Sequence, residues 1–163
     1  MQAVLICTTI LFGIIAQMML LNVNIKNLKA SGRLFFVFGT LLVLAANIYI
    51  SCNIPIEFHM KLYIQVIHIP VFLIFWLITR ISAIKIVFTL YTAVFMIYPA
   101  NLVLTVLLHT EAQLHIAIYY SIYITVCIMM LLLINYFFRP YFRYLIENYN
   151  NSSFVKLSLL PLT

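Results

Sequence analysis

Five long stretches of this sequence contain no charged residue, and they constrain the fold more than any other feature. They cover residues 1–25, 34–56, 62–79, 86–110 and 112–138. A helix needs about 20 consecutive apolar residues to cross the hydrocarbon core of a bilayer. The stretches therefore predict transmembrane helices over about 2–23, 34–53, 62–79, 86–108 and 116–138.

The composition also favours a membrane protein. Hydrophobic residues make up 66% of the chain and charged residues 7%, whereas soluble domains are about half apolar and about a quarter charged. Transmembrane β-strands alternate polar and apolar residues, and these stretches do not. The expected fold is all-α: one polytopic helix bundle over residues 1–163, with five transmembrane helices and the start of a sixth.

The distribution of charge predicts the orientation of this bundle. Eight of the nine basic residues lie in three segments that a five-span chain places on one side. They are Lys26, Lys29 and Arg33, then Arg80 and Lys85, then Arg139, Arg143 and Lys156. Because basic loops stay in the cytoplasm, the N-terminus is expected outside. The basic residues are divided among loops and do not form one face, so the bilayer is the expected partner and nucleic acid is not.

Motifs for catalysis or metal binding are missing from the sequence. Cys7, Cys52 and Cys127 form no CxxC pair and are expected to pack as small apolar residues, with a Cys7–Cys52 disulfide as the alternative. The histidines include no HExxH motif and no pair four residues apart. There is also no P-loop, dinucleotide fingerprint or nucleophile elbow. We therefore expect no enzyme active site, no metal and no cofactor.

Four polar residues within the expected spans lie near the outer ends of those spans. They are Asn47, Gln65, His68 and Asn101. In one interpretation they form hydrogen bonds between helices, worth about 0.6 kcal/mol each. In the other they line a cavity that is open to the outside and receives a ligand. A transporter would place its polar site nearer the midplane of the bilayer.

The C-terminal part interrupts the apolar pattern with "FFRPYFRYLIEN", residues 137–148. Arg139 and Arg143 are four residues apart, a spacing that puts both on one helical face. Pro140 suits the first turn of a new helix. We predict an amphipathic helix over about 140–150 that lies along the membrane, followed by the start of a sixth span over 154–163.

Three sequence features together resemble one family. They are the basic loop "NIKNLKASGR", the "FFRPYFRYLIEN" exit from the fifth span and the return "FVKLSLLPL". This layout resembles the transmembrane sensor region of GHKL-type sensor histidine kinases of Gram-positive bacteria, the group of peptide-sensing quorum receptors. Family members continue into a dimerisation helix pair and an ATP-binding domain, and residues 1–163 contain neither.

The resemblance implies a sensor module in the bacterial cytoplasmic membrane. The module would receive an extracellular ligand, with a small peptide as the expected class, and pass the signal to a kinase domain outside this chain. The resemblance also implies a homodimer. In this hypothesis Asn47, Gln65, His68 and Asn101 bind the ligand, and Arg139, Pro140 and Arg143 transmit the signal.

Two other functions fit a chain of this kind. A small transporter or channel subunit would show a flux after reconstitution, although the scarcity of ionisable residues inside the spans argues against it. A scaffold without its own ligand would copurify with another membrane protein.

Overall fold

The structure is a computed structural model that describes residues 2–55, 58, 61–62, 64–109 and 116–159. All regular secondary structure in these ranges is helical, which confirms the all-α expectation. The α-helices are α1 (Gln2–Leu20), α2 (Ala30–Asn53), α4 (Ile69–Thr79), α5 (Ala83–His109), α6 (Ile116–Leu133), α7 (Arg139–Asn148) and α8 (Asn151–Leu159). The described chain also contains a 3₁₀ turn, η1 (Ile25–Asn27), and two π-helical turns, η2 (Ile64–His68) and η3 (Ile134–Phe138).

Three helical stretches of the described chain are long and apolar enough to cross a membrane. They are Ala30–Asn53, Ala83–Val103 and Ala117–Asn148, and the last runs through α6, η3 and α7. Val4–Leu20 and Ile64–Thr79 are shorter apolar helices. The protein therefore has the helices of a membrane protein, and five crossings with an outside N-terminus stay a prediction.

The observed helix boundaries differ from the expected ones at the charged ends. Helix α2 begins at Ala30 and includes Arg33, whose backbone N–H donates to the Lys29 carbonyl at 3.0 Å. The helix thus extends beyond the expected span boundary at residue 34, because an exposed charge is acceptable in the first turn of a helix. In the C-terminal part, α7 ends at Asn148 and α8 covers Asn151–Leu159, whereas the predictions were 140–150 and 154–163. Residues 160–163 lie outside the described ranges.

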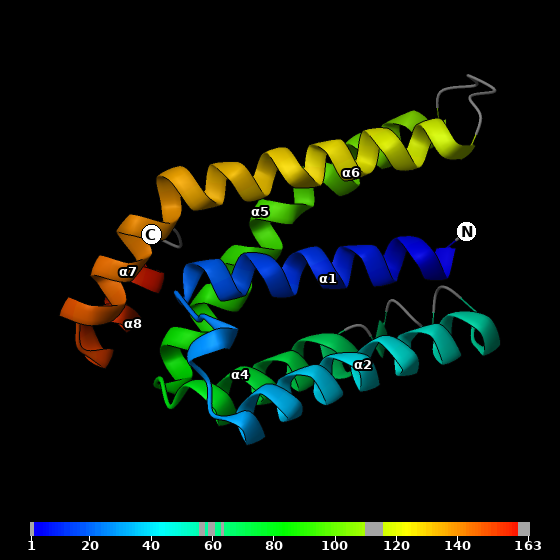
Figure 1. Cartoon of the computed structure of the whole chain (residues 1–163). Coiled ribbons are helices and arrows are strands. Elements are labelled where there is room, and N and C mark those ends of the chain that lie inside the picture. Colours follow the sequence, from blue (N-terminus) through cyan, green and yellow to red (C-terminus); the bar gives the residue numbers. More distant parts are fainter. Residues whose placement is uncertain (1, 56–57, 59–60, 63, 110–115, 160–163) are drawn as a thin grey trace.

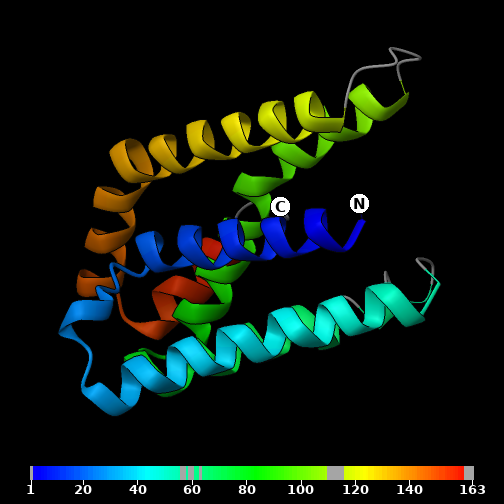
Figure 2. The same ribbon diagram turned by 45° about the vertical axis from the view of Figure 1, so that its right-hand side comes forward.

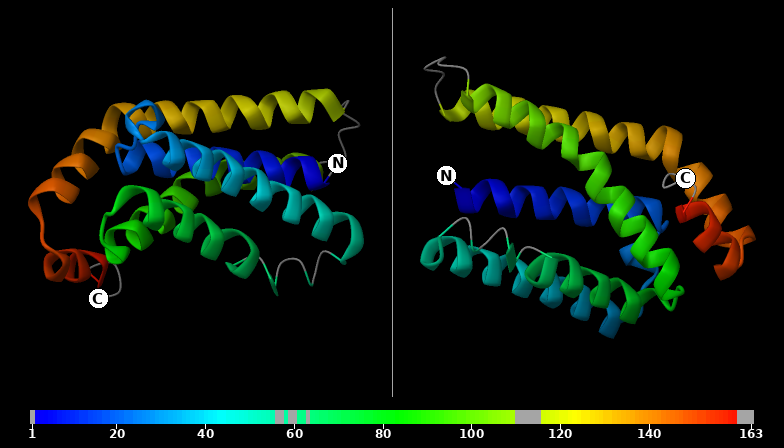
Figure 3. Two further views of the ribbon diagram at one scale, coloured as in Figure 1. Left: turned by 60° about the horizontal axis from the view of Figure 1, so that its bottom comes forward. Right: turned by 180° about the vertical axis from the view of Figure 1, so that it is seen from behind.

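Helix α1 lies in the middle of the bundle and contacts α2, α5, α6, η3 and α7. Helices α2 and α4 pair on one side of α1, and α6 lies on the other side against α5 (Figure 1). Helix α5 crosses the bundle diagonally and contacts α4, α1 and α6 in turn (Figure 3). Two connections, residues 21–29 before α2 and residues 80–82 before α5, lie at the same end of the bundle as α7 and α8 (Figures 1 and 2).

The core consists of apolar side chains from these contacts. The buried residues include Ile10, Ile14, Val43, Phe75 and Ile86 around α1, α2, α4 and α5, and Ala16, Ala93, Ile97, Ile134 and Phe142 around α1, α5, η3 and α7. Small residues allow close helix packing in an apolar solvent. A Cβ atom on Gly39 of α2 would lie 3.0 Å from the Ile74 side chain of α4, so a larger residue here would force that side chain to shift where α2 and α4 approach closely.

Candidate functional site

We define the basic end of the bundle as the end that bears Lys26, Lys29, Arg33, Arg80 and Lys156. All five side chains are exposed, and the structure shows no hydrogen bond or ion pair for any of them within the described chain. The helix α7 and the last turn of α1 also lie here (Figure 1). Two polar contacts fasten α7 to the bundle at this end.

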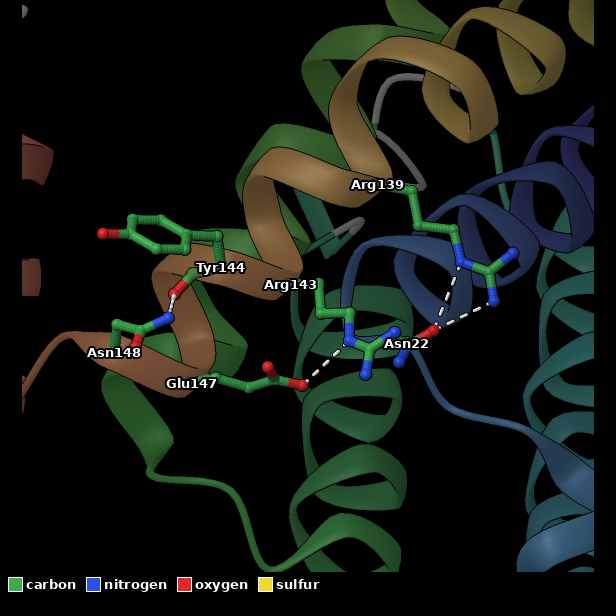
Figure 4. A network of polar contacts seen from close by, with 6 residues as sticks. All are labelled: Asn22, Arg139, Arg143, Tyr144, Glu147 and Asn148. Carbon is green, nitrogen blue, oxygen red and sulfur yellow. Dashed lines mark hydrogen bonds and ion pairs between the residues drawn. The ribbon is translucent and has the colours of Figure 1, made fainter.

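The first contact joins Arg139 of α7 to Asn22, which follows α1. Arg139 Nε and Nη2 donate to Asn22 Oδ1 at 3.2 and 2.9 Å (Figure 4). Arg139 Nη1 donates to Asn135 Oδ1 at 3.0 Å. Asn22 has a positive φ of 53°, and asparagine is a common residue at the left-handed position after a helix. The hydrogen bonds Asn22 N–H to Met19 and Val23 N–H to Met18 close the end of α1. The fold of this turn thus places the Asn22 amide oxygen toward Arg139.

The second contact joins Lys85 of α5 to the end of α7. Lys85 Nζ donates to the Ile146 carbonyl at 2.6 Å and lies 5.3 Å from the centre of the Phe154 ring. Ile146 is in the last turn of α7, where carbonyl groups lack helical partners and a cation is favourable. Lys85 therefore connects α5, α7 and α8.

Three aromatic rings pack beneath these polar contacts. Phe88 of α5 stacks on Phe142 of α7 with 5.7 Å between ring centroids, and it meets Phe154 of α8 edge-on at 5.4 Å. Phe154 is fully buried and Phe142 is 5% exposed. Burial of aromatic rings of this size contributes strongly to packing, so α7 and α8 are held against α5 and do not hang free of the bundle.

The other residues predicted to transmit a signal lie on the outer surface of α7. Arg143 pairs with Glu147 at 2.9 Å, one turn along the same helix (Figure 4). Both side chains are more than half exposed, and such pairs contribute only about 0.3–0.5 kcal/mol. Pro140 occupies the first turn of α7, as expected, and the helix changes direction beside it at η3 (Figures 1 and 2). Prolines and π-turns are the usual causes of such bends.

Inside the bundle, away from the basic end, Tyr123 of α6 makes polar contacts with two other helices. Its hydroxyl lies 2.6 Å from Thr9 Oγ1 of α1 and donates to Asn101 Oδ1 of α5 at 3.3 Å. The Tyr123 side chain is fully buried beside Ala100 and Cys127. This group, which we call the Tyr123 network (Thr9, Asn101 and Tyr123), links α1, α5 and α6.

The structure divides the four predicted ligand residues between two places. Asn101 belongs to the Tyr123 network, whereas Asn47 lies on α2, and Gln65 and His68 lie in η2, which packs against α2. Asn47 is fully buried and its Nδ2 donates to the Val43 carbonyl at 2.8 Å. Gln65 is exposed, and its amide lies 3.2 Å from the Lys61 and Leu62 carbonyl oxygens. Binding of a ligand by these residues stays a prediction.

The residues described contain no cluster of three or more histidine, cysteine or acidic side chains that could hold a metal ion. Cys7, Cys52 and Cys127 are free thiols, so the alternative of a Cys7–Cys52 disulfide is wrong in this structure. Cys127 is buried in the core, as expected for a small apolar residue.

Comparison with protein-family models, curated proteins and solved structures gives no match for this chain.

Several residues of these sites were not predicted. Lys85 was treated only as a topology signal, and Asn22 and Tyr123 were given no role. The positions of Lys85 and Asn22 depend on which helices become neighbours, and no local motif encodes that. For Tyr123 a signal existed, because a tyrosine in the middle of an apolar span needs a partner for its hydroxyl.

Proposed function

We infer that this chain is the membrane-embedded sensing part of a receptor, in which five apolar helical segments cross the bilayer with the N-terminus outside. In this proposal the basic end faces the cytoplasm, and the Tyr123 network lies in the outer half of the membrane. The segregation of exposed basic side chains at one end supports this orientation. The resemblance to GHKL-type kinase sensors suggests a small extracellular peptide as the signal, and a kinase domain in a homodimer as the recipient.

The observation that carries the proposal is the continuous helical stretch Ala117–Asn148, which is 32 residues long. One part of it contacts α1 and α5 through Tyr123. The other part contacts the turn after α1 through Arg139 and receives Lys85 at its end. Because α6 and α7 belong to one continuous helical stretch, a displacement of α6 at the Tyr123 network would be transmitted along the backbone to α7.

A ligand acts on such a bundle only if it binds two arrangements with different affinities. Asn101 is hydrogen-bonded to Tyr123, so a ligand that takes Asn101 as its own partner would compete with the Tyr123 hydroxyl. The freed α6 would then adopt a second position relative to α1. The bend at η3 and the contacts of Arg139 would convert this shift into a movement of α7.

The test perturbs the Tyr123 network and measures the position of α7. Spin labels are attached at Ser31→Cys on α2 and Tyr144→Cys on α7, both exposed, after Cys7, Cys52 and Cys127 are replaced by alanine. We expect Tyr123→Phe, which removes only the hydroxyl, to change the distance distribution between the labels. Tyr98→Phe is the matched control, because Tyr98 is 54% exposed on α5. Equal distributions in the Tyr123→Phe variant and its parent would contradict the coupling.

The link to a kinase needs a separate test. Reading the coding sequence beyond residue 163 shows whether the frame continues through a sixth span into an ATP-binding domain. A stop codon directly after Thr163 would remove the kinase part of the proposal and leave the coupling between α6 and α7 untouched.

A further inference from the structure

A groove runs along the face of α5 that points away from the core. Its volume is about 540 Å³, and the described residues that line it lie between Ala83 and Phe95 of this one helix, including Phe88 and Tyr91. Volumes of 300–1,000 Å³ are typical of small-molecule sites. The helix axis rises about 18 Å from Ala83 to Phe95, which is close to half the thickness of the roughly 30 Å hydrocarbon core. The groove therefore has the length of an acyl chain in one leaflet.

The two faces of α5 differ in what they contact. Ile86, Ala93 and Ile97 are at most 2% exposed and pack inside the bundle, whereas Tyr91 is 62% and Phe95 72% exposed on the groove side. Figure 3 shows α5 crossing the bundle diagonally in the view from behind. In a membrane, an apolar groove on an outer face opens toward lipid, so hydrocarbon is the occupant that its lining favours.

The mouth of the groove lies at the basic end. Arg80, with a positive φ of 56°, follows α4 and precedes Ala83 by three residues. Lys156 of α8 is two residues beyond Phe154, whose ring packs on Phe88 of the groove. Both basic side chains are exposed. Glu147, the one acidic residue in the described part of this end, is paired with Arg143, so the charges of Arg80 and Lys156 are uncompensated.

An acyl-length groove with two uncompensated cations at its mouth matches an anionic phospholipid. We propose that α5 forms a binding site for one such lipid, with an acyl chain along the groove and the headgroup phosphate held by Arg80 and Lys156. The inference needs the basic end to lie at the headgroups, and it does not depend on the sensing function.

Fluorescence quenching by brominated lipids tests the site in the reconstituted full chain. The single tryptophan, Trp76, is replaced by phenylalanine, and Tyr91→Trp places a reporter in the groove. The protein is placed in phosphatidylcholine vesicles that contain either dibrominated phosphatidylglycerol or dibrominated phosphatidylcholine. A basic residue near the membrane surface attracts anionic lipid by about 1 kcal/mol, or about fivefold. We expect the phosphatidylglycerol to associate at least about fivefold more strongly at this reporter.

Two matched controls separate a site from general charge attraction. The double variant Arg80→Gln/Lys156→Gln should reduce the ratio of phosphatidylglycerol to phosphatidylcholine association at Tyr91→Trp to about one. The double variant Lys26→Gln/Lys29→Gln removes the same charge at the same end, and it should leave this ratio unchanged. A Phe38→Trp reporter, on the exposed face of α2, measures the preference that general charge attraction by Lys29 and Arg33 produces, and this preference should be smaller than the one at Tyr91→Trp. Equal quenching by both lipids at Tyr91→Trp, or equal loss of preference in the two double variants, would overturn the proposal.

Discussion

Individual polar side chains have a large influence on the stability of a bundle as apolar as this one. Gln17, Asn47 and Thr89 are fully buried. Gln17 Nε2 reaches the Ile86 carbonyl at 3.4 Å, the same oxygen that accepts from Thr89 Oγ1 at 3.0 Å. Gln17 Oε1 has no hydrogen-bond partner in the described part of the chain. A buried unsatisfied polar atom costs about 1–3 kcal/mol, so Gln17 is a position at which stability is not optimised.

Replacing Gln17 with leucine should therefore preserve or raise stability. Leucine has a similar volume and removes the unsatisfied oxygen, and we expect a gain of about 1 kcal/mol in the free energy of unfolding. Gln17→Ala would instead leave a cavity and cost about 2 kcal/mol or more. Unfolding of the purified protein in detergent, followed by circular dichroism, measures both. Equal destabilisation by leucine and alanine would show that the amide itself is required.

Lys85 is the second residue whose substitution should change the stability of the protein. Lys85→Met retains the apolar stem and removes the cation that binds the Ile146 carbonyl. Hydrogen bonds to charged groups contribute about 1.5–3 kcal/mol, and partial exposure places the expected loss near the lower value. The loss should appear as faster amide hydrogen exchange in 145–156. Lys26→Met is the control, because that side chain is exposed and no residue of the described ranges pairs with it. Equal effects of the two substitutions would contradict the role of Lys85.

At the scale of elements, the important unit is the bent helical stretch that joins α6, η3 and α7. Its two halves face different surroundings: α6 packs against α5 and α1, and α7 buries Phe142 and Leu145 at the basic end. Arg139 lies at the joint and bonds to Asn22. The attachment of α7 therefore depends on this one arginine, on Lys85 and on the aromatic contacts of Phe142.

Removal of the Arg139 contact should loosen α7 selectively. In Arg139→Gln we expect hydrogen exchange to rise in 139–148 by about fivefold, equivalent to about 1 kcal/mol for an exposed charge-assisted contact, and to stay unchanged in 117–130. Arg143→Gln is the matched substitution, since it breaks only the exposed pair with Glu147 and should change exchange less than twofold. An Arg143 effect as large as that of Arg139 would show that the Asn22 contact does not hold the helix.

At the scale of the whole molecule, the bundle has two chemically different ends. Exposed basic side chains gather where α7 and α8 lie, and the start of α1 and the end of α2 lie at the other end (Figure 1). This asymmetry is independent of any ligand. It predicts a single orientation in the membrane.

Thiol labelling in intact cells measures that orientation. Cys52 is a free, exposed thiol at the end of α2, and a Lys26→Cys substitution places a thiol at the basic end. Each thiol is tested in its own variant, in which all other cysteines are replaced by alanine. A membrane-impermeant maleimide should label Cys52 in intact cells. It should label Lys26→Cys only after the cells are opened. The reverse pattern would place the N-terminus in the cytoplasm.

The sequence predicted where helices lie better than which helices touch. The absence of charge marked the apolar segments, because each is flanked by residues such as Lys61, Arg80 and Arg139. It did not indicate their neighbours, since in lipid the outer and inner faces of a helix are both apolar and no amphipathic pattern distinguishes them. For this reason the sequence left open whether Asn47 and Asn101 form hydrogen bonds between helices or line one cavity, and it did not indicate that the Tyr123 hydroxyl of α6 donates to Asn101 Oδ1.

The π-turn η3 also determines how this protein can change by insertion or deletion. A π-turn accommodates one more residue than an α-helical turn, and each residue of an α-helix corresponds to about 100° of rotation. Loss of a single residue within Ile134–Phe138 would therefore convert the turn to regular α-helix while the residues after it keep their orientation. The same deletion within α6 would rotate everything downstream by roughly 100°. Two homologues that differ by one residue in η3 would thus present the same side of α7 to a partner, so η3 is a place where the helix can gain or lose a residue without a change in its output.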